Sequence, residues 1–229
     1  MILLKDINLL FTGTEELSGK DVLIGEGRIV KIADRIDPQQ LEQSAEVVDC
    51  SGMVVLPGLV NCHHHFYQTL QRCLPEVQDS PLFDWLVYLY EIWKNLDEDA
   101  IYWSTLVACA ELARTGCTTT TDNLYVFPRG VSSNFIDVEI EAALKIGLRF
   151  HPTRGSMSLG RSKGGLPPDE VVQSEDEILK DSERLIDRYH DSQPGAMTRI
   201  ALGPCSPFSV SKELLKATRE LASKRGVLL

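Results

Sequence analysis

Residues 54–65 read VVLPGLVNCHHH, an apolar run with a Pro-Gly step that ends in three consecutive histidines. In a strand, residues i and i+2 project to the same side. His63 and His65 can therefore direct two imidazoles to one point while His64 faces away. Two neutral imidazoles on one rigid strand end supply half of a zinc or iron site. On spacing alone, three other interpretations stay open: a chance run, an adventitious metal patch, or core histidines with satisfied ring nitrogens.

Downstream of this segment, short apolar strands alternate with longer helical patterns, which is typical of βαβ units and a parallel sheet. Strands are predicted over residues 59–63, 118–122, 148–152 and 198–202. Helices are predicted over residues 99–114, 133–146, 168–189 and 211–225. Another apolar strand begins at Val227.

Upstream of the histidine segment, the sequence pattern is different. Short strands are predicted over residues 2–4, 7–10, 21–24 and 28–32. Gly25-Glu26-Gly27 joins the last two at hairpin spacing, and glycine tolerates the positive φ that such turns need. The sequence thus predicts a small β-rich module over residues 1–56, followed by an α/β domain over residues 57–229.

Charge and composition exclude several classes of protein. The chain has 229 residues with 23 Lys and Arg against 33 Asp and Glu, a net charge of −10. We expect no nucleic-acid partner, because nucleic-acid binders use clustered cations to displace counterions. We expect no membrane partner, because no apolar run reaches the roughly 18 to 20 residues that cross a bilayer. Six scattered cysteines without a C-x-x-C pair predict free thiols and a cytoplasmic protein.

The histidine segment, extended to residue 72, resembles the first barrel strand of the amidohydrolase superfamily, whose motif is an apolar strand, Pro-Gly and His-x-His. Further similar segments are ELARTGCTTTTDN (111–123), RFHPTRGSMSLG (149–160) and ALGPCSPFSVS (201–211). They are most similar to the aminohydrolase branch of 8-oxoguanine deaminases and hydroxydechloroatrazine ethylaminohydrolases. The resemblance implies an α/β fold: the N-terminal part of a metal-dependent (β/α)8 TIM barrel, with strands one to four and the start of strand five, preceded by a small β-sandwich-type module.

The resemblance also implies roles for five residues. His63 and His65 correspond to the ligands of one divalent metal, with zinc favoured over iron. Gln68 lies where guanine deaminases place an amide against the purine edge, although it could be a solvated loop residue. Arg154 would point at a carbonyl or N7 edge of the base, or form a salt bridge with an acidic residue. Phe208 would cover a flat ring. Guanine deaminases carry an arginine before this aromatic residue, and its absence here favours 8-oxoguanine as the substrate.

The implied reaction is hydrolytic deamination, in which a hydroxide attacks the ring carbon bearing the amino group and a carboxylate passes a proton to the departing ammonia. The expected substrate is a small purine or triazine-like molecule, with 8-oxoguanine giving urate and ammonia. Deamination of guanine, isocytosine or hydroxytriazines, ring opening of a cyclic amide, and a non-enzymatic interaction module remain alternatives.

In the family, the catalytic carboxylate and the remaining ligands come from strands five, six and eight. We therefore expect the catalytic residues beyond Leu229, and we expect this chain alone to be inactive. The oligomeric state stays open, with a homo-oligomer among the candidates.

Overall fold

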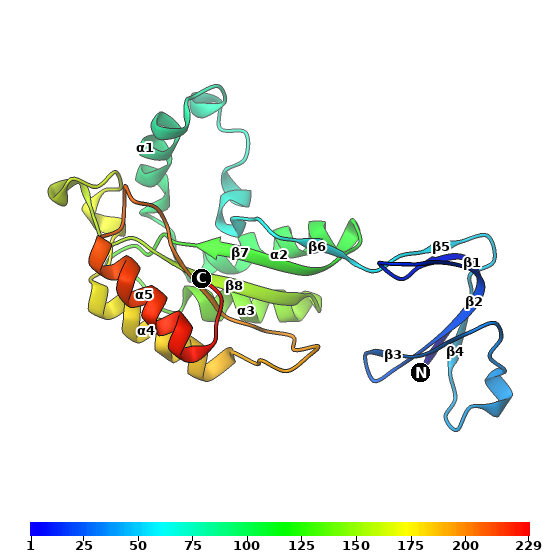
Figure 1. The fold of residues 1–229 in the computed structure, drawn as a ribbon. Coiled ribbons are helices and arrows are strands. Elements are labelled where there is room, and N and C mark those ends of the chain that lie inside the picture. Colours follow the sequence, from blue (N-terminus) through cyan, green and yellow to red (C-terminus); the bar gives the residue numbers. More distant parts are fainter. The chain divides into compact units, whose positions relative to one another are not determined.

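The computed structural model describes residues 1–229 (Figure 1). The chain divides into two compact units, Met1–Gly58 and Leu59–Leu229. This division lies two residues after the boundary predicted between residues 56 and 57. None of the helices combines the length and hydrophobicity that crossing a lipid bilayer requires. All six cysteines are unpaired.

The first unit is one mixed sheet in the order β3-β2-β1-β4, with β5 also paired to β1. Its elements are β1 (Ile2–Phe11), β2 (Glu16–Gly25), β3 (Arg28–Ala33), β4 (Glu46–Asp49), β5 (Val54–Val55) and the 3-10 helix η1 (Pro38–Gln40). The two predicted N-terminal strands form one strand, because an irregularity between Leu4 and Ile7, with Asp6 at φ 55°, lets pairing to β2 continue. Glu26 and Gly27 form the predicted turn, both with positive φ.

The second unit contains four parallel strands in the order β6-β7-β8-β9. They are β6 (Leu59–Asn61), β7 (Cys117–Leu124), β8 (Arg149–Ser156) and β9 (Ala201–Pro204). The α-helices are α1 (Leu82–Trp93), α2 (Glu98–Arg114), α3 (Phe135–Ile146), α4 (Glu175–Tyr189) and α5 (Lys212–Arg225). The 3-10 helices are η2 (Phe66–Gln71), η3 (Pro75–Val77), η4 (Arg161–Lys163) and η5 (Asp169–Val171). Parallel strands in sequential order with intervening helices are the arrangement predicted for the first part of a (β/α)8 barrel.

The strand bounds differ from the prediction at several ends. The first strand stops at Asn61 rather than at residue 63, and the fourth begins at Ala201 because Thr198 makes only an isolated bridge to Phe150. The predicted helix over 168–189 starts at Glu175, where Ser174 and Glu177 form a capping box. Beyond α5, Leu228 pairs in parallel with Ala201, as expected of the start of a further strand.

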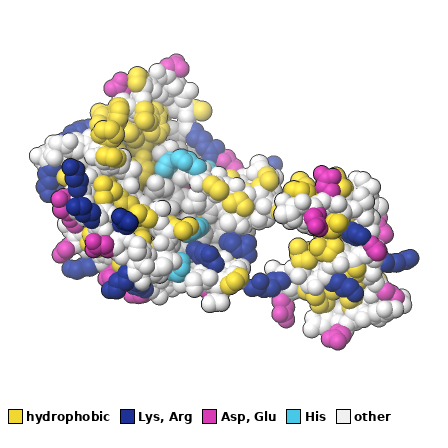
Figure 2. Space-filling view, in the orientation of Figure 1, with side chains coloured by type: hydrophobic (Ala, Val, Ile, Leu, Met, Phe, Trp, Pro, Cys, Tyr) yellow, Lys and Arg dark blue, Asp and Glu magenta, His cyan; other side chains and the backbone are white.

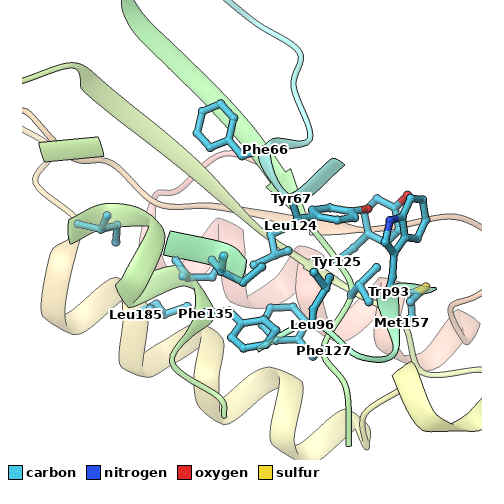
Figure 3. Packing of buried hydrophobic residues seen from close by; sticks show 14 of the residues in the cluster. Phe66, Tyr67, Trp93, Leu96, Leu124, Tyr125, Phe127, Phe135, Met157 and Leu185 are labelled. Carbon is cyan, nitrogen blue, oxygen red and sulfur yellow. The ribbon is translucent and has the colours of Figure 1, made fainter. Parts of the chain in front are cut away.

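The parallel sheet has two unlike faces. On β7, Thr120, Asp122 and Leu124 are buried, whereas the alternating residues are partly exposed. The buried side packs against α2 and α3 and contributes to an aromatic-rich core (Figure 3). The other side borders a cavity of about 460 Å³ whose lining includes Thr119, Asn123 and His151. Functional side chains therefore have to point to this second side or lie at the strand ends.

Candidate metal and substrate site

The three histidines follow β6 after one intervening residue, Cys62. The ring centroids of His63 and His65 are 5.2 Å apart, with their planes at 85°. The His64 ring instead contacts Phe66, with centroids 4.8 Å apart. The structure thus brings His63 and His65 together and separates His64 from them, although all three lie beyond the last strand residue. Figure 2 shows histidine side chains (cyan) at the surface, beside hydrophobic side chains that gather over α1.

A backbone contact sets the protonation of His65. Its Nδ1 atom lies 2.8 Å from the carbonyl oxygen of Asn123, at the end of β7. A carbonyl oxygen only accepts, so Nδ1 carries the hydrogen and Nε2 keeps its lone pair. Burial lowers the pKa of His65, which further favours the neutral ring. Asn123 N–H also donates to the His64 carbonyl at 3.0 Å, so two backbone groups of Asn123 hold this segment.

These two rings fit a metal ion. Zinc binds an imidazole nitrogen at about 2.0–2.1 Å, so two rings bound at a tetrahedral angle have centroids about 5 Å apart. The observed separation is 5.2 Å. Nowhere in residues 1–229 do three His, Cys, Asp or Glu side chains come together as a metal-binding group. Because a catalytic zinc ion takes three protein ligands, the pair accounts for only part of such a set.

Two cavities adjoin the histidines. One of about 530 Å³ lies between the segment after β6 and α1, and its lining includes Gln68, Trp85 and Trp93 as well as the three histidines. The other, of about 430 Å³, is lined by the histidines together with Tyr125 and Cys205, among others. The predicted Gln68 therefore lies beside the histidine pair. Its Nε2 donates to the Tyr67 hydroxyl at 3.4 Å, which orients the amide.

Arg154 does not reach either cavity, which corrects one of the two interpretations offered for it. Its side chain is fully buried, and its guanidinium donates to Asp181 at 3.0 Å, to Gln173 at 2.7 Å and to the Gly155 carbonyl at 2.5 Å. It also stacks over the Phe127 ring at 4.1 Å. Strand alternation is the reason: Arg154 occupies the buried face of β8, whereas its neighbour Thr153 lines the 430 Å³ cavity beside the histidines and the 460 Å³ cavity beside the sheet. The salt-bridge alternative is the one that holds.

Phe208 is also displaced from the histidines. It is 56% exposed and packs edge-on against Phe83 of α1, with ring centroids 5.3 Å apart. It is not among the residues that line the two histidine cavities. The structure therefore groups His63, His65 and Gln68 and leaves Arg154 and Phe208 outside.

Three residues around the candidate site had no role assigned to them from the sequence. Asn123 holds His65, and the Tyr125 ring lies 5.5 Å from the His65 ring. Asp122 is fully buried and accepts the Phe66 N–H at 2.6 Å. All three follow the threonine run of the second barrel strand. Their position at the end of a predicted strand could have indicated them, because the carboxyl ends of neighbouring parallel strands meet at one edge of the sheet.

Comparisons with known proteins agree with this arrangement. A sequence profile of the amidohydrolase family matches residues 54–229. An 8-oxoguanine deaminase of Pseudomonas aeruginosa is 46% identical over 220 residues, which make up 96% of this chain and 49% of that protein. A hydroxydechloroatrazine ethylaminohydrolase of Pseudomonas sp. strain ADP is 38% identical over 222 residues, 93% of this chain and 46% of that protein.

A solved structure shares the same fold. An atrazine chlorohydrolase from Arthrobacter aurescens TC1, described as complexed with zinc, superposes with a TM-score of 0.88 at 31% identity. The match covers 99% of this chain and 51% of that one. The chain thus spans about half the length of the relatives it matches.

Proposed function

Because the chain belongs to the amidohydrolase family, we propose that it forms the metal-binding and substrate-binding portion of an enzyme that hydrolytically deaminates a purine-like heterocycle. The favoured reaction converts 8-oxoguanine and water to urate and ammonia. The observation that carries this proposal is the His63 and His65 pair, with its rings 5.2 Å apart and the Nδ1 hydrogen of His65 held by a carbonyl. The 46% identity to an 8-oxoguanine deaminase supports the choice of substrate.

His63 and His65 would hold one divalent metal, with zinc favoured over iron. When bound in such a site, zinc lowers the pKa of water and makes a nucleophile available at neutral pH. The chain itself positions the rings: Asn123 fixes the tautomer of His65, and the Tyr125 ring packs edge-on against it. The solved relative described as complexed with zinc supports this choice of metal.

Gln68 would read the substrate edge. Its Nε2 already donates to Tyr67, which leaves the amide oxygen as the acceptor for a ring N–H. The indoles of Trp85 and Trp93 line the same cavity and would exclude water from an aromatic ring. An oxidised purine presents lactam N–H groups and a flat surface, which match these features.

A second candidate is removal of an amine substituent from a hydroxytriazine. It is supported by the 38% identity to a hydroxydechloroatrazine ethylaminohydrolase and by the triazine-hydrolase fold. Triazines and purines share a flat, nitrogen-rich ring, so the pocket described above would accept either.

Ammonia or amine release from a panel of substrates tests the proposal. The full-length protein should be loaded with zinc and assayed on 8-oxoguanine, guanine, isocytosine and hydroxytriazines. We expect the highest kcat/KM with 8-oxoguanine and about one divalent metal per chain by elemental analysis. Turnover confined to hydroxytriazines would support the second candidate, and a protein that turns over none of these substrates would contradict both.

A further inference from the structure

Two carboxyl side chains from different elements meet inside the core of the second unit. Asp122 of β7 and Glu139 of α3 are both fully buried. The two carboxyl groups lie close enough to shift each other's pKa, and no N–H or O–H group hydrogen-bonds either Glu139 oxygen or Asp122 Oδ2. The other ionisable groups that sense this pair are Cys109 of α2, Tyr67 and Tyr125.

None of these neighbours compensates a negative charge. Burial raises the pKa of Cys109 to about 12, and it also raises the pKa of Tyr67 and of Tyr125, so all three are uncharged at neutral pH. Two adjacent carboxylates cannot both stay ionised in an apolar site without a cation. Two carboxylates are also both acceptors, so contact between them requires a proton. Burial accordingly raises the pKa of both groups, and the charge of Asp122 raises the pKa of Glu139 further.

The surroundings decide which residue carries the proton. Asp122 Oδ1 accepts the Phe66 N–H at 2.6 Å, and the Asn123 N–H lowers the pKa of Asp122 as well. Glu139 has no comparable donor. The charge is therefore better stabilised on Asp122, and Glu139 is the neutral acid that donates to it.

This pair is linked to the histidine site through the backbone. Phe66 directly follows His65, and the Asn123 carbonyl accepts from His65 Nδ1. The Asp122 carboxylate therefore holds Phe66, the residue after His65. It also directly precedes Asn123, whose carbonyl fixes the tautomer of His65. The Phe66 ring, stacked on Phe150 of β8 with centroids 5.5 Å apart, limits other movement of this segment.

We propose that Glu139 and Asp122 share one proton in a buried hydrogen bond and act as positioning residues that tie α3 to the backbone groups around His65. Neither residue touches the metal or the substrate. The inference rests on the proposed metal role of His63 and His65.

Zinc affinity of the full chain tests this positioning role, measured by competition with a chromophoric chelator. Glu139→Gln keeps a donor to Asp122, whereas Glu139→Leu removes it. The matched control is Ile140→Ala, which removes buried packing from the same helix without altering the carboxyl pair. His63→Asn and His65→Asn show how much of the measured zinc affinity comes from the two histidines.

We expect Glu139→Leu to bind zinc about tenfold more weakly, a cost typical of groups that orient metal ligands. Glu139→Gln and Ile140→Ala should stay within about twofold of the unaltered protein. Equal affinity of Glu139→Leu and Ile140→Ala, or failure of Glu139→Gln to rescue, would overturn the positioning role alone. Unchanged affinity in both histidine variants would overturn the proposed function, and the positioning role with it.

A second measurement does not depend on Glu139→Leu folding. Infrared spectroscopy of the protein with isotopically labelled glutamate carboxyl groups should show a protonated carboxylic C=O band at neutral pH. Glu139→Gln should remove that band. Its absence from the unaltered protein, or its persistence in Glu139→Gln, would show that Glu139 holds no shared proton.

Discussion

The Nδ1 atom of His65 lies 2.8 Å from the carbonyl oxygen of Asn123, so a ring that follows the first barrel strand is oriented by the end of the second. The contact leaves Nε2 of His65 as the free acceptor. Together with His63, it forms a candidate metal site that neither strand would form alone.

The first prediction concerns the ligand pair. His63→Asn and His65→Asn should each reduce bound zinc to a small fraction of one ion per chain after dialysis, because each removes one nitrogen ligand. His64→Asn is the matched control, since its ring packs against Phe66 instead. Elemental analysis gives the metal content. Full zinc occupancy in the His63 or His65 variant would rule out that residue as a ligand.

The second prediction concerns Gln68. Gln68→Ala should lower kcat/KM for 8-oxoguanine about tenfold, mainly through KM, because a ring N–H loses its acceptor at a cost of about 1–3 kcal/mol. Gln78, an exposed residue that also lines this cavity, provides the control variant Gln78→Ala. Steady-state ammonia release measures both. If the two alanine variants are equally active, Gln68 does not contact the substrate.

The third prediction separates stability from substrate binding at Arg154. Arg154→Met leaves Asp181 and Gln173 without a buried partner, and the free energy of unfolding should fall by about 3 kcal/mol. KM should stay unchanged. The control is Arg188→Met, because Arg188 forms an exposed ion pair with Asp137 that contributes less than about 1 kcal/mol. Urea denaturation and steady-state kinetics provide the two readouts. A large rise in KM with unchanged stability would show that Arg154 contacts the substrate.

The fourth prediction is a pH dependence of folding. Unfolded carboxyl groups release their protons near pH 4, whereas burial raises the pKa of Glu139 well above its usual value. Between the unfolded and the folded pKa of Glu139, the folded chain binds more protons than the unfolded chain. The contribution of Glu139 to the free energy of unfolding is therefore fully present at low pH and is lost as the pH rises. The slope should approach about 1.4 kcal/mol per pH unit for one proton.

Glu139→Gln carries no such proton and should lack this contribution. Urea denaturation of both proteins from pH 5 to pH 8 measures the difference between their slopes. Parallel profiles would mean that Glu139 is ionised in the folded protein.

Local patterns were enough to predict the histidine pair and the order of strands and helices in the second unit. The spacing of His63 and His65 on extended backbone placed both rings on one side, even though β6 ends at Asn61. The alternation of apolar strands with helical patterns predicted the parallel sheet, because the hydrophobic periodicities of strands and of helices can each be recognised within a few residues. The exact ends were less predictable, since capping at Ser174 and an isolated bridge at Thr198 depend on neighbouring segments.

The sequence by itself determined the family, and it predicted the candidate ligand pair and Gln68 from short contiguous motifs. Only the tertiary structure decided that Arg154 lies on the buried face of β8 and that Asn123 orients His65. It also decided that Glu139 of α3 is buried where the charge of Asp122 of β7 raises its pKa. The physical reason is that strand register and helix packing bring together residues far apart in the chain, and burial then determines their charge. No local pattern specifies that register.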